Sequence, residues 1–164
     1  GDIGDMADPT LGGPHTQSET HGYIIGGYRH QSPTGNRTRI EKYQFAASVT
    51  SSTVADAGTS VGYGAACSST THGVFQRDTD SIRKHDFASD GDAVTHGSFT
   101  NTGYSNRSGQ SGTTDAFFSG GAAAPGGFTT GWPHVDKVNY ASNSTATDWG
   151  DLIDPAAGPK GTQY

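Results

Sequence analysis

Aspartates spaced three residues apart are the first candidates for chemistry in this sequence. They recur near both ends of the chain, as Asp2, Asp5 and Asp8 and again as Asp148, Asp151 and Asp154. Ca²⁺ takes about six to eight oxygen ligands, and neither set lies in a twelve-residue EF-hand loop or a glycine–aspartate nonapeptide array. We interpret them as turn residues that accept backbone hydrogen bonds. Asp148, Asp151 and Asp154 remain weak calcium candidates.

Three histidines, His21, His72 and His96, each lie between a threonine and a glycine. A zinc site needs about four converging ligands, whereas these residues are separated by long stretches of chain. Strand-end hydrogen bonds are the favoured interpretation. The sequence contains no Gly-x-Ser-x-Gly nucleophile turn, no Walker motif and no dinucleotide-binding glycine motif. We therefore predict no catalytic residues, no cofactor, no metal and no enzymatic activity.

Aromatic residues in or beside glycine-rich loops are candidates for stacking on sugar rings. The candidates are Trp132, Tyr104, Tyr63 and Tyr28. Trp132, which precedes Pro133 in the longest loop, is the strongest of them. The alternative role is packing between repeats or subunits, and we expect it for Trp149, which occupies the position of Ile3 and Ala57 in a repeated block.

Three Asn-x-Ser/Thr sequences could carry N-linked glycan if the protein is secreted by a cell that glycosylates. They begin at Asn36, Asn106 and Asn143. Serine and threonine are abundant in this chain, so such triplets also arise by chance.

Two sequence blocks recur along the chain. The first begins with threonine and continues into an apolar run; it opens at Thr20, Thr71 and Thr114. The second has the pattern β-branched residue, x, Lys, x, x, aromatic, Ala, and begins at Ile40, Ile82 and Val135. Lys84 lies 42 positions after Lys42, and Lys137 lies 53 positions after Lys84. These blocks define imperfect tandem repeats.

The two ends of the chain also match each other. Residues 2–17 align with residues 148–163 without a gap, and eight of the sixteen pairs are identical. We predict the end of a preceding repeat in residues 1–19, followed by repeats over 20–69 and 70–112 and an incomplete repeat over 113–164. Either the chain belongs to a longer array, or neighbouring copies continue the pattern head to tail.

Short segments rich in β-branched and aromatic residues, bounded by Gly or Pro, predict strands. They cover residues 23–25, 40–45, 81–87, 116–119 and 135–140. Tyr43 and Phe45 fall on one face of their strand, and Ile40 and Lys42 on the other. The fold class is therefore all-β, with units of roughly 40 to 53 residues that hold three or four short strands and resemble β-propeller blades. A fibre-type β repeat is the alternative.

The apolar run followed by Gly26-Gly27 resembles the kelch repeat weakly. Over nearly the whole chain, the repeated blocks resemble virion structural and tail-fibre-like proteins of tailed bacteriophages, especially those of marine cyanobacteria. The matching blocks are residues 20–27, 40–46 and 147–152. This resemblance implies a structural or adhesive role in a virion or an extracellular assembly, and no chemistry.

Composition excludes several other classes. Hydrophobic residues make up 30% of 164 residues, and no apolar run reaches the ~18 residues that a membrane helix needs. A net charge of −6 with ten Lys and Arg argues against a nucleic-acid partner. The single cysteine, Cys67, cannot form an internal disulfide, and we predict that it is buried.

We therefore expect a non-enzymatic structural protein of a virion or extracellular assembly, whose partners are copies of itself or adjoining virion proteins. A carbohydrate-binding adhesin that contacts host surface glycan is the alternative. The core should contain the apolar strand residues Ile24, Ile40, Phe45, Ile82, Phe87, Phe117, Val135 and Tyr140.

Overall fold

The computed structural model describes residues 5–7, 9–31, 33–47, 49–77, 80–123 and 131–156. All regular structure in these residues is β-strand, so the predicted all-β class is confirmed. The strands are β1 (His15–Gln17), β2 (His21–Ile25), β3 (Tyr28–Arg29), β4 (Gly35–Gln44), β5 (Ser52–Val61), β6 (Ala66–Ser68), β7 (His72–Gln76), β8 (Ser81–Asp86), β9 (Val94–Ser98), β10 (Tyr104–Ser105), β11 (Ser108–Ser111), β12 (Asp115–Ser119), β13 (Ala122–Ala123), β14 (Trp132–Asn139) and β15 (Thr147–Ala156).

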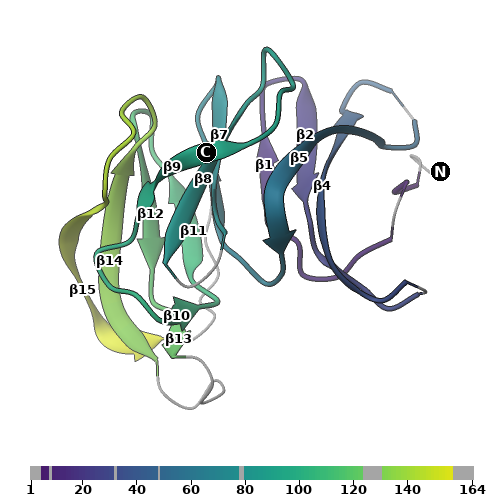
Figure 1. Cartoon of the computed structure of the whole chain (residues 1–164). Helices are drawn as coiled ribbons and strands as arrows, with labels where there is room; N and C mark the ends of the chain where they lie inside the picture. Colours follow the sequence, from purple (N-terminus) through teal and green to yellow (C-terminus); the bar gives the residue numbers. More distant parts are fainter. Residues whose placement is uncertain are drawn as a thin grey trace.

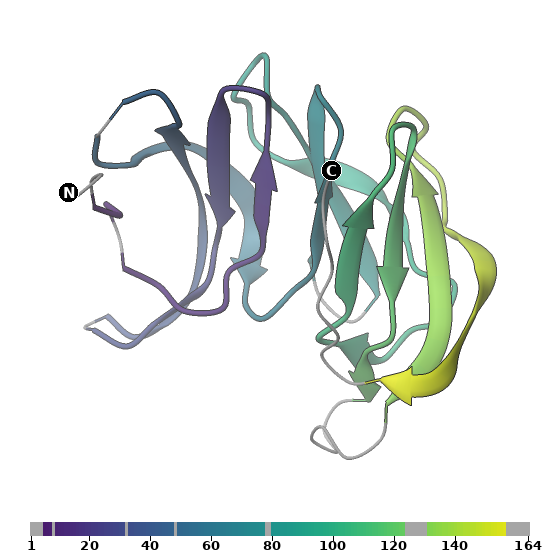
Figure 2. The same cartoon turned by 180° about the vertical axis from the view of Figure 1, so that it is seen from behind.

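The strands form three consecutive antiparallel meanders (Figures 1 and 2). The first sheet has the order β1-β2-β4-β5, with β3 paired to the early part of β4. The second sheet is β6-β7-β8-β9, and the third is β11-β12-β14-β15. A separate pair, β10 with β13, lies at one end of the third sheet. Each main sheet therefore repeats one topology in chain order.

The predicted strand segments coincide with β2, β4, β8, β12 and β14. Turns begin where the sequence places paired glycines: Gly26 and Gly27 have φ of 61° and 91°, and Gly120 and Gly121 have 67° and 118°. These are left-handed conformations that glycine adopts without a steric penalty. The amide of Gly27 donates to the carbonyl of Val61, which ties this turn to the end of β5.

The sheets follow one another side by side in chain order (Figure 1). Two apolar clusters are buried between them. One cluster joins Tyr23, Ile25 and Ile40 of the first sheet to Phe75 and Phe87 of the second. The other joins residues of the second and third sheets, namely Cys67, Val74, Ile82, Phe99, Ala116, Phe118, Val138 and Tyr140. The second sheet is thus covered on both faces.

Some residues expected in the core are not buried. Phe45 is 51% exposed, whereas its repeat equivalents Phe87 and Tyr140 are buried. Phe117 and Val135 are only half-buried, and Trp149, for which packing between repeats was expected, is 61% exposed. The reason is position: these residues lie on the outward faces of the first and third sheets, where no sheet of this chain covers them.

The sheets begin one strand earlier than the repeats defined from sequence. The predicted boundaries after residues 69 and 112 follow β6 and β11, the first strands of the second and third sheets. The division into repeats thus remains a prediction.

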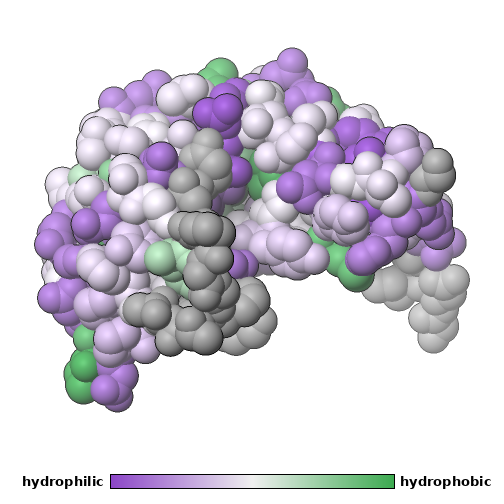
Figure 3. All heavy atoms as spheres, turned by 60° about the horizontal axis from the view of Figure 1, so that its bottom comes forward, coloured by the Kyte–Doolittle hydropathy of each residue, from purple (hydrophilic) through white to green (hydrophobic). Residues whose placement is uncertain are grey.

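None of the described residues forms a helix long and apolar enough to cross a membrane. Viewed as in Figure 3, the molecule has a crescent outline with a largely hydrophilic surface.

Phe87 and Phe45 form a matched pair for testing this packing. Phe87 stacks on Tyr23 of the neighbouring sheet, with ring centroids 4.6 Å apart and planes at 14°. We expect Phe87→Ala to lower the free energy of unfolding by about 3 to 5 kcal/mol, as core aromatic truncations do. Phe45→Ala should cost less than about 1 kcal/mol, because that side chain is largely in solvent. Chemical denaturation in dilute solution measures both; equal losses would contradict the packing.

Candidate binding face where the first strands meet

The first strands of the three sheets lie side by side and are joined by one repeated hydrogen bond. The backbone amide of Gln17 in β1 donates to the Ser68 hydroxyl in β6 at 2.8 Å. The amide of Ser68 donates in turn to the Ser111 hydroxyl in β11, also at 2.8 Å. Gln17, Ser68 and Ser111 pair with Gly22, Gly73 and Ala116 in their sheets, so they occupy equivalent positions.

The approach of these strands leaves no room for side chains at two glycines. A Cβ on Gly73 would lie 2.7 Å from the hydroxyl oxygen of Thr16. A Cβ on Gly109 would lie 2.1 Å from the backbone carbonyl oxygen of Ala66. Glycine is therefore required at both places, so that β1 can approach β7 and β6 can approach β11.

Equivalent four-residue turns connect the first and second strands of each sheet. The amides of Ser18, Ser69 and Gly112 donate to the carbonyls of His21, His72 and Asp115, at 2.8 to 2.9 Å. In the first two turns, the Thr20 and Thr71 hydroxyls lie 2.8 Å from Nδ1 of the following histidine. His21 and His72 thus make strand-end hydrogen bonds, as the sequence predicted, and stabilise their own turns.

The three turns surround a cavity of about 430 Å³. Its lining is dominated by hydroxyl, amide and carboxylate side chains, contributed by Gln17, Ser18, Glu19, Ser68, Ser69, Thr70, Ser111, Gly112 and Thr113. Glu19, Thr70 and Thr113 are exposed at the tips of the turns. The cavity therefore combines one residue set from each sheet, and any change in the packing of the sheets changes its shape.

A second hollow of about 480 Å³ opens between the first and second sheets. Lys42, from the first sheet, lines it and binds Asp90 of the second, with Nζ 2.7 Å from the carboxylate. The ammonium also lies 5.6 Å from the centre of the Tyr23 ring. The two sheets are thus bridged by a lysine–aspartate pair above an aromatic stack.

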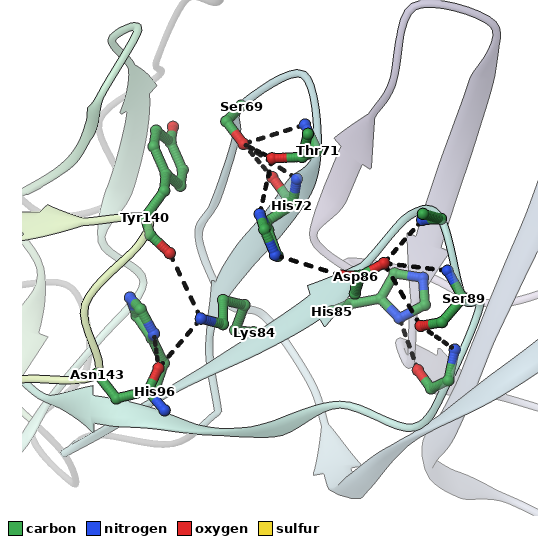
Figure 4. Close-up of polar contacts among 12 residues, drawn as sticks. Ser69, Thr71, His72, Lys84, His85, Asp86, Ser89, His96, Tyr140 and Asn143 are labelled. Carbon is green, nitrogen blue, oxygen red and sulfur yellow. Dashed lines mark hydrogen bonds and ion pairs between the residues drawn. The ribbon is translucent and has the colours of Figure 1, made fainter.

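The next lysine repeats this bridge between the second and third sheets (Figure 4). Lys84 donates to the side-chain oxygen of Asn143 at 3.1 Å and lies 3.5 Å from the carbonyl of Tyr140. The same Asn143 oxygen lies 2.9 Å from His96 Nδ1, and His96 Nε2 lies 2.8 Å from the carbonyl of Asn139. His96 is buried, and its two ring nitrogens join the second sheet to the third.

His85 is the other fully buried histidine, and it lies between the first and second sheets. Its Nδ1 contacts the carbonyl of Gly91 at 3.0 Å, and its ring meets the edge of Tyr23 at 5.2 Å. Its Nε2 is buried without a hydrogen-bond partner. Burial lowers the pKa of His85 below its ordinary value, because a charged ring there would lose its hydration.

A buried ion pair fixes the segment that leads into the third sheet. Arg107 Nη1 lies 3.1 Å from a carboxylate oxygen of Asp136, and both side chains are fully buried. Thr100 donates to the same carboxylate through its amide and its hydroxyl. The Arg107 guanidinium also lies 4.1 Å from the centre of the Phe99 ring. The charge of Asp136 is therefore fully engaged in holding the structure.

The structure brings together two of the four aromatic binding candidates. Trp132 stacks on Tyr104 with ring centroids 4.6 Å apart, and both are half-buried. Tyr63 is exposed and lies against Gly12, while Tyr28 packs edge-on against His30 at 4.8 Å. Because the Trp132 and Tyr104 rings face each other, this pair has a packing role here, and the aromatics do not form one binding surface.

The remaining sequence candidates lie apart. Asn36 is exposed on β4, Asn106 is half-buried at a positive φ of 54°, and the Asn143 side chain is engaged between sheets. Asp148, Asp151 and Asp154 are spread along β15; Asp148 accepts from the Gly150 amide, and Asp151 lies 3.0 Å from His134. Asp2 and Asp8 lie outside the described residues. Across the described ranges, no three metal-ligating side chains gather to hold an ion.

Cys67 is buried between the second and third sheets, as predicted from sequence. Burial raises the pKa of its thiol to about 12. The thiol lies 3.6 Å from the carbonyl of Phe117 and is therefore a packed side chain.

Comparison with known proteins adds a likeness in fold. No family model and no curated protein matches the sequence. The solved structure of YjhT is similar, with a TM-score of 0.69 over 91% of this chain and 12% sequence identity. This chain spans 54% of the YjhT chain. At this identity the likeness concerns the fold alone.

Sequence reasoning missed the hydroxyl-lined cavity and the lysine bridges. The signal for the bridges was present, since the repeated block places a lysine at position 42, 84 and 137. Its role was not evident, because a lysine within a strand is more often a solvent-facing residue. The cavity had no local signal, since its lining comes from three distant turns.

The buried His85 gives a prediction for pH. Its folded-state pKa lies below that of the unfolded chain, about 6.5 for histidine, so the unfolded state takes up the proton first as the pH falls. The contribution of neutral His85 to stability is complete above the unfolded-state pKa. It is lost as the pH falls from there toward the lower folded-state pKa. His85→Gln should show a smaller fall in melting temperature between pH 7.5 and pH 5 than the unaltered protein. Equal falls would contradict this role.

Proposed function

We propose that this chain is a non-enzymatic structural module of a virion tail, fibre or other extracellular assembly, built from propeller-like blades. The observation that carries the proposal is that the chain makes one sheet-to-sheet contact twice. At both contacts, first strands meet through a serine hydroxyl, and a lysine reaches to the next sheet. Such repetition is the basis of an array that extends by adding units.

The arrangement of the strands supports the comparison with propeller blades. Each blade of a propeller is a four-stranded antiparallel sheet arranged around a central channel. Here the first strands β1, β6 and β11 are adjacent, and the cavity lies at their turns. The crescent outline in Figure 3 agrees with part of a ring.

The polar groups between the sheets support a structural role. Lys42, Lys84 and Arg107 each bind an oxygen from another part of the fold. His96 uses both ring nitrogens in such contacts. These four side chains therefore have partners that serve packing.

Cell fractionation tests the structural proposal. Cultures that produce this protein would be separated into cytosol, secreted material and purified particles, and its peptides quantified by mass spectrometry. We expect enrichment in the particle or extracellular fraction, in constant ratio to known structural proteins of that fraction. Accumulation in the cytosol alone would overturn the proposal.

Carbohydrate binding is the second candidate function, and the cavity between the three turns favours it. The residues around it carry hydroxyl, amide and carboxylate groups that can bind sugar hydroxyls, and the apolar parts of their side chains can contact the sugar ring. Exposed Glu19 adds a carboxylate that can accept hydrogen bonds from two adjacent sugar hydroxyls. A surface glycan of a host cell is the ligand class that this lining fits.

Glycan-array binding followed by calorimetry tests this second function. The variant Glu19→Ala/Thr70→Ala/Thr113→Ala changes only exposed turn tips, so the fold should be retained. We expect binding to weaken at least about tenfold, since each lost hydrogen bond is worth roughly 0.5 to 1.5 kcal/mol. Trp132→Ala is the contrasting variant and should leave binding unchanged. Loss of binding in Trp132→Ala alone would move the site to the aromatic pair.

A further inference from the structure

Each sheet has two distinct faces, and the difference decides which surfaces can meet. We call the face toward the next sheet in chain order the leading face, and the opposite face the trailing face. On the third strand of the first sheet, Ile40 and Lys42 belong to the leading face, and Tyr43 and Phe45 to the trailing face. A contact always joins one leading face to one trailing face.

The three sheets share one backbone hydrogen bond at the aromatic end of the third strand. The amides of Phe45, Phe87 and Tyr140 donate to the carbonyls of Thr20, Thr71 and Thr114, at 3.0, 3.0 and 3.1 Å. These aromatics are therefore structurally equivalent as well as equivalent in sequence. The same holds for Lys42, Lys84 and Lys137, which pair with Tyr23, Val74 and Phe117 on the second strands.

The first contact shows what a leading face binds. Tyr23 receives the stacked ring of Phe87, and Lys42 binds Asp90, which lies three residues after Phe87. Val54, the bulged residue of the fourth strand, is partly buried against the cluster between the first and second sheets. The trailing face thus contributes an aromatic ring and a nearby oxygen, and the leading face contributes the aromatic ring and the lysine that they contact.

The second contact repeats the pattern with other side chains. Tyr140 packs into the second sheet, and its hydroxyl donates to the carbonyl of Ser68 at 2.9 Å. Lys84 binds Asn143, three residues after Tyr140. His96, the bulged residue of the fourth strand and the equivalent of Val54, is 1% exposed. The same positions therefore make both contacts, although the residue types at these positions differ.

The leading face of the third sheet presents the same set to solvent. Phe117 stands at the position of Tyr23, and Lys137 at that of Lys42. Trp149 stands at the bulge position that Val54 and His96 occupy in the other two sheets, and it is 61% exposed. Lys137 lies 4.1 Å from the centre of the Trp149 ring, and Phe117 meets that ring edge-on at 5.9 Å. The three side chains form one continuous aromatic and cationic surface.

The trailing face of the first sheet presents the complementary set. Phe45 is the equivalent of Phe87 and Tyr140 and is 51% exposed, and Tyr43 packs edge-on against it at 5.8 Å. The two open faces thus carry the two halves of the contact made twice within the chain.

We infer that these faces bind each other between two copies of this chain, head to tail. Phe45 of one copy stacks on Phe117 and Trp149 of the other, as Phe87 stacks on Tyr23. Lys137 lies over Trp149 at the position from which Lys42 and Lys84 reach the next sheet. This inference rests on the proposed blade packing and names its partner: a second copy of the same protein.

The contact joins different surfaces, so it is heterologous, and such contacts close into rings or extend into filaments. Two copies contribute six main sheets, which lies within the roughly four to eight blades of closed propellers. A closed head-to-tail dimer is therefore the expected species.

Light scattering coupled to size-exclusion chromatography tests the inference over a dilution series. We expect the unaltered chain to have twice its mass of 16.9 kDa at high concentration. Phe45→Glu and Trp149→Glu each place a carboxylate on one of the two faces and should each be monomeric. Val94→Glu is the matched control, because Val94 is 52% exposed on the second sheet, away from both faces, and this variant should still dimerise.

Mixing the two variants supplies the decisive measurement. Phe45→Glu keeps an intact third-sheet face, and Trp149→Glu keeps an intact first-sheet face, so an equimolar mixture should form a one-to-one dimer through a single contact. Circular dichroism spectra identical to that of the unaltered chain show that the variants are folded. Association that survives in either variant alone, or a mixture that stays monomeric, would overturn the inference.

The outcome separates this inference from the proposed function. A chain that is monomeric at every concentration but enriched in particles would overturn the self-docking inference only. A chain that dimerises as expected but remains in the cytosol would overturn the structural role in a virion or extracellular assembly only.

Discussion

The close approach of the first strands is the constraint on which the rest of this structure depends. Gly73 and Gly109 have no space for a Cβ, because the neighbouring strand's Thr16 side chain or Ala66 carbonyl occupies it. Hydroxyls then complete the contact, since Ser68 and Ser111 accept amide hydrogens that would otherwise be buried without a partner. With the first strands fixed in this way, the remaining strands are free to diverge and to bury aromatic residues between the sheets.

The contacts between sheets have a direction because their polar parts differ. The leading face contributes a lysine, and the trailing face contributes the oxygen that the lysine binds. Charged groups are buried at a cost unless they are paired, so a leading face cannot pack against another leading face without leaving lysines unpaired. This asymmetry orders the sheets within the chain and accounts for the head-to-tail sense of the proposed docking between copies.

Much of the fold could be predicted from the sequence because strand identity is a local property. Alternating apolar residues and paired glycines located β2, β4, β8, β12 and β14, and the recurring blocks revealed repetition. Burial could not be predicted at the same level. Phe45 and Phe87 share a residue type, a strand position and a backbone hydrogen bond, yet only Phe87 has a neighbouring sheet against its ring.

The sequence by itself determined the all-β class, the repeated blocks and the buried Cys67, because each follows from residue types along a short segment. Only the tertiary structure decided that hydroxyls from three turns surround one cavity, that Trp132 stacks on Tyr104, and which oxygens the repeated lysines bind. These arrangements depend on the rotation and spacing of one sheet relative to the next. That geometry is set by contacts between residues distant in the chain, and no local periodicity encodes it.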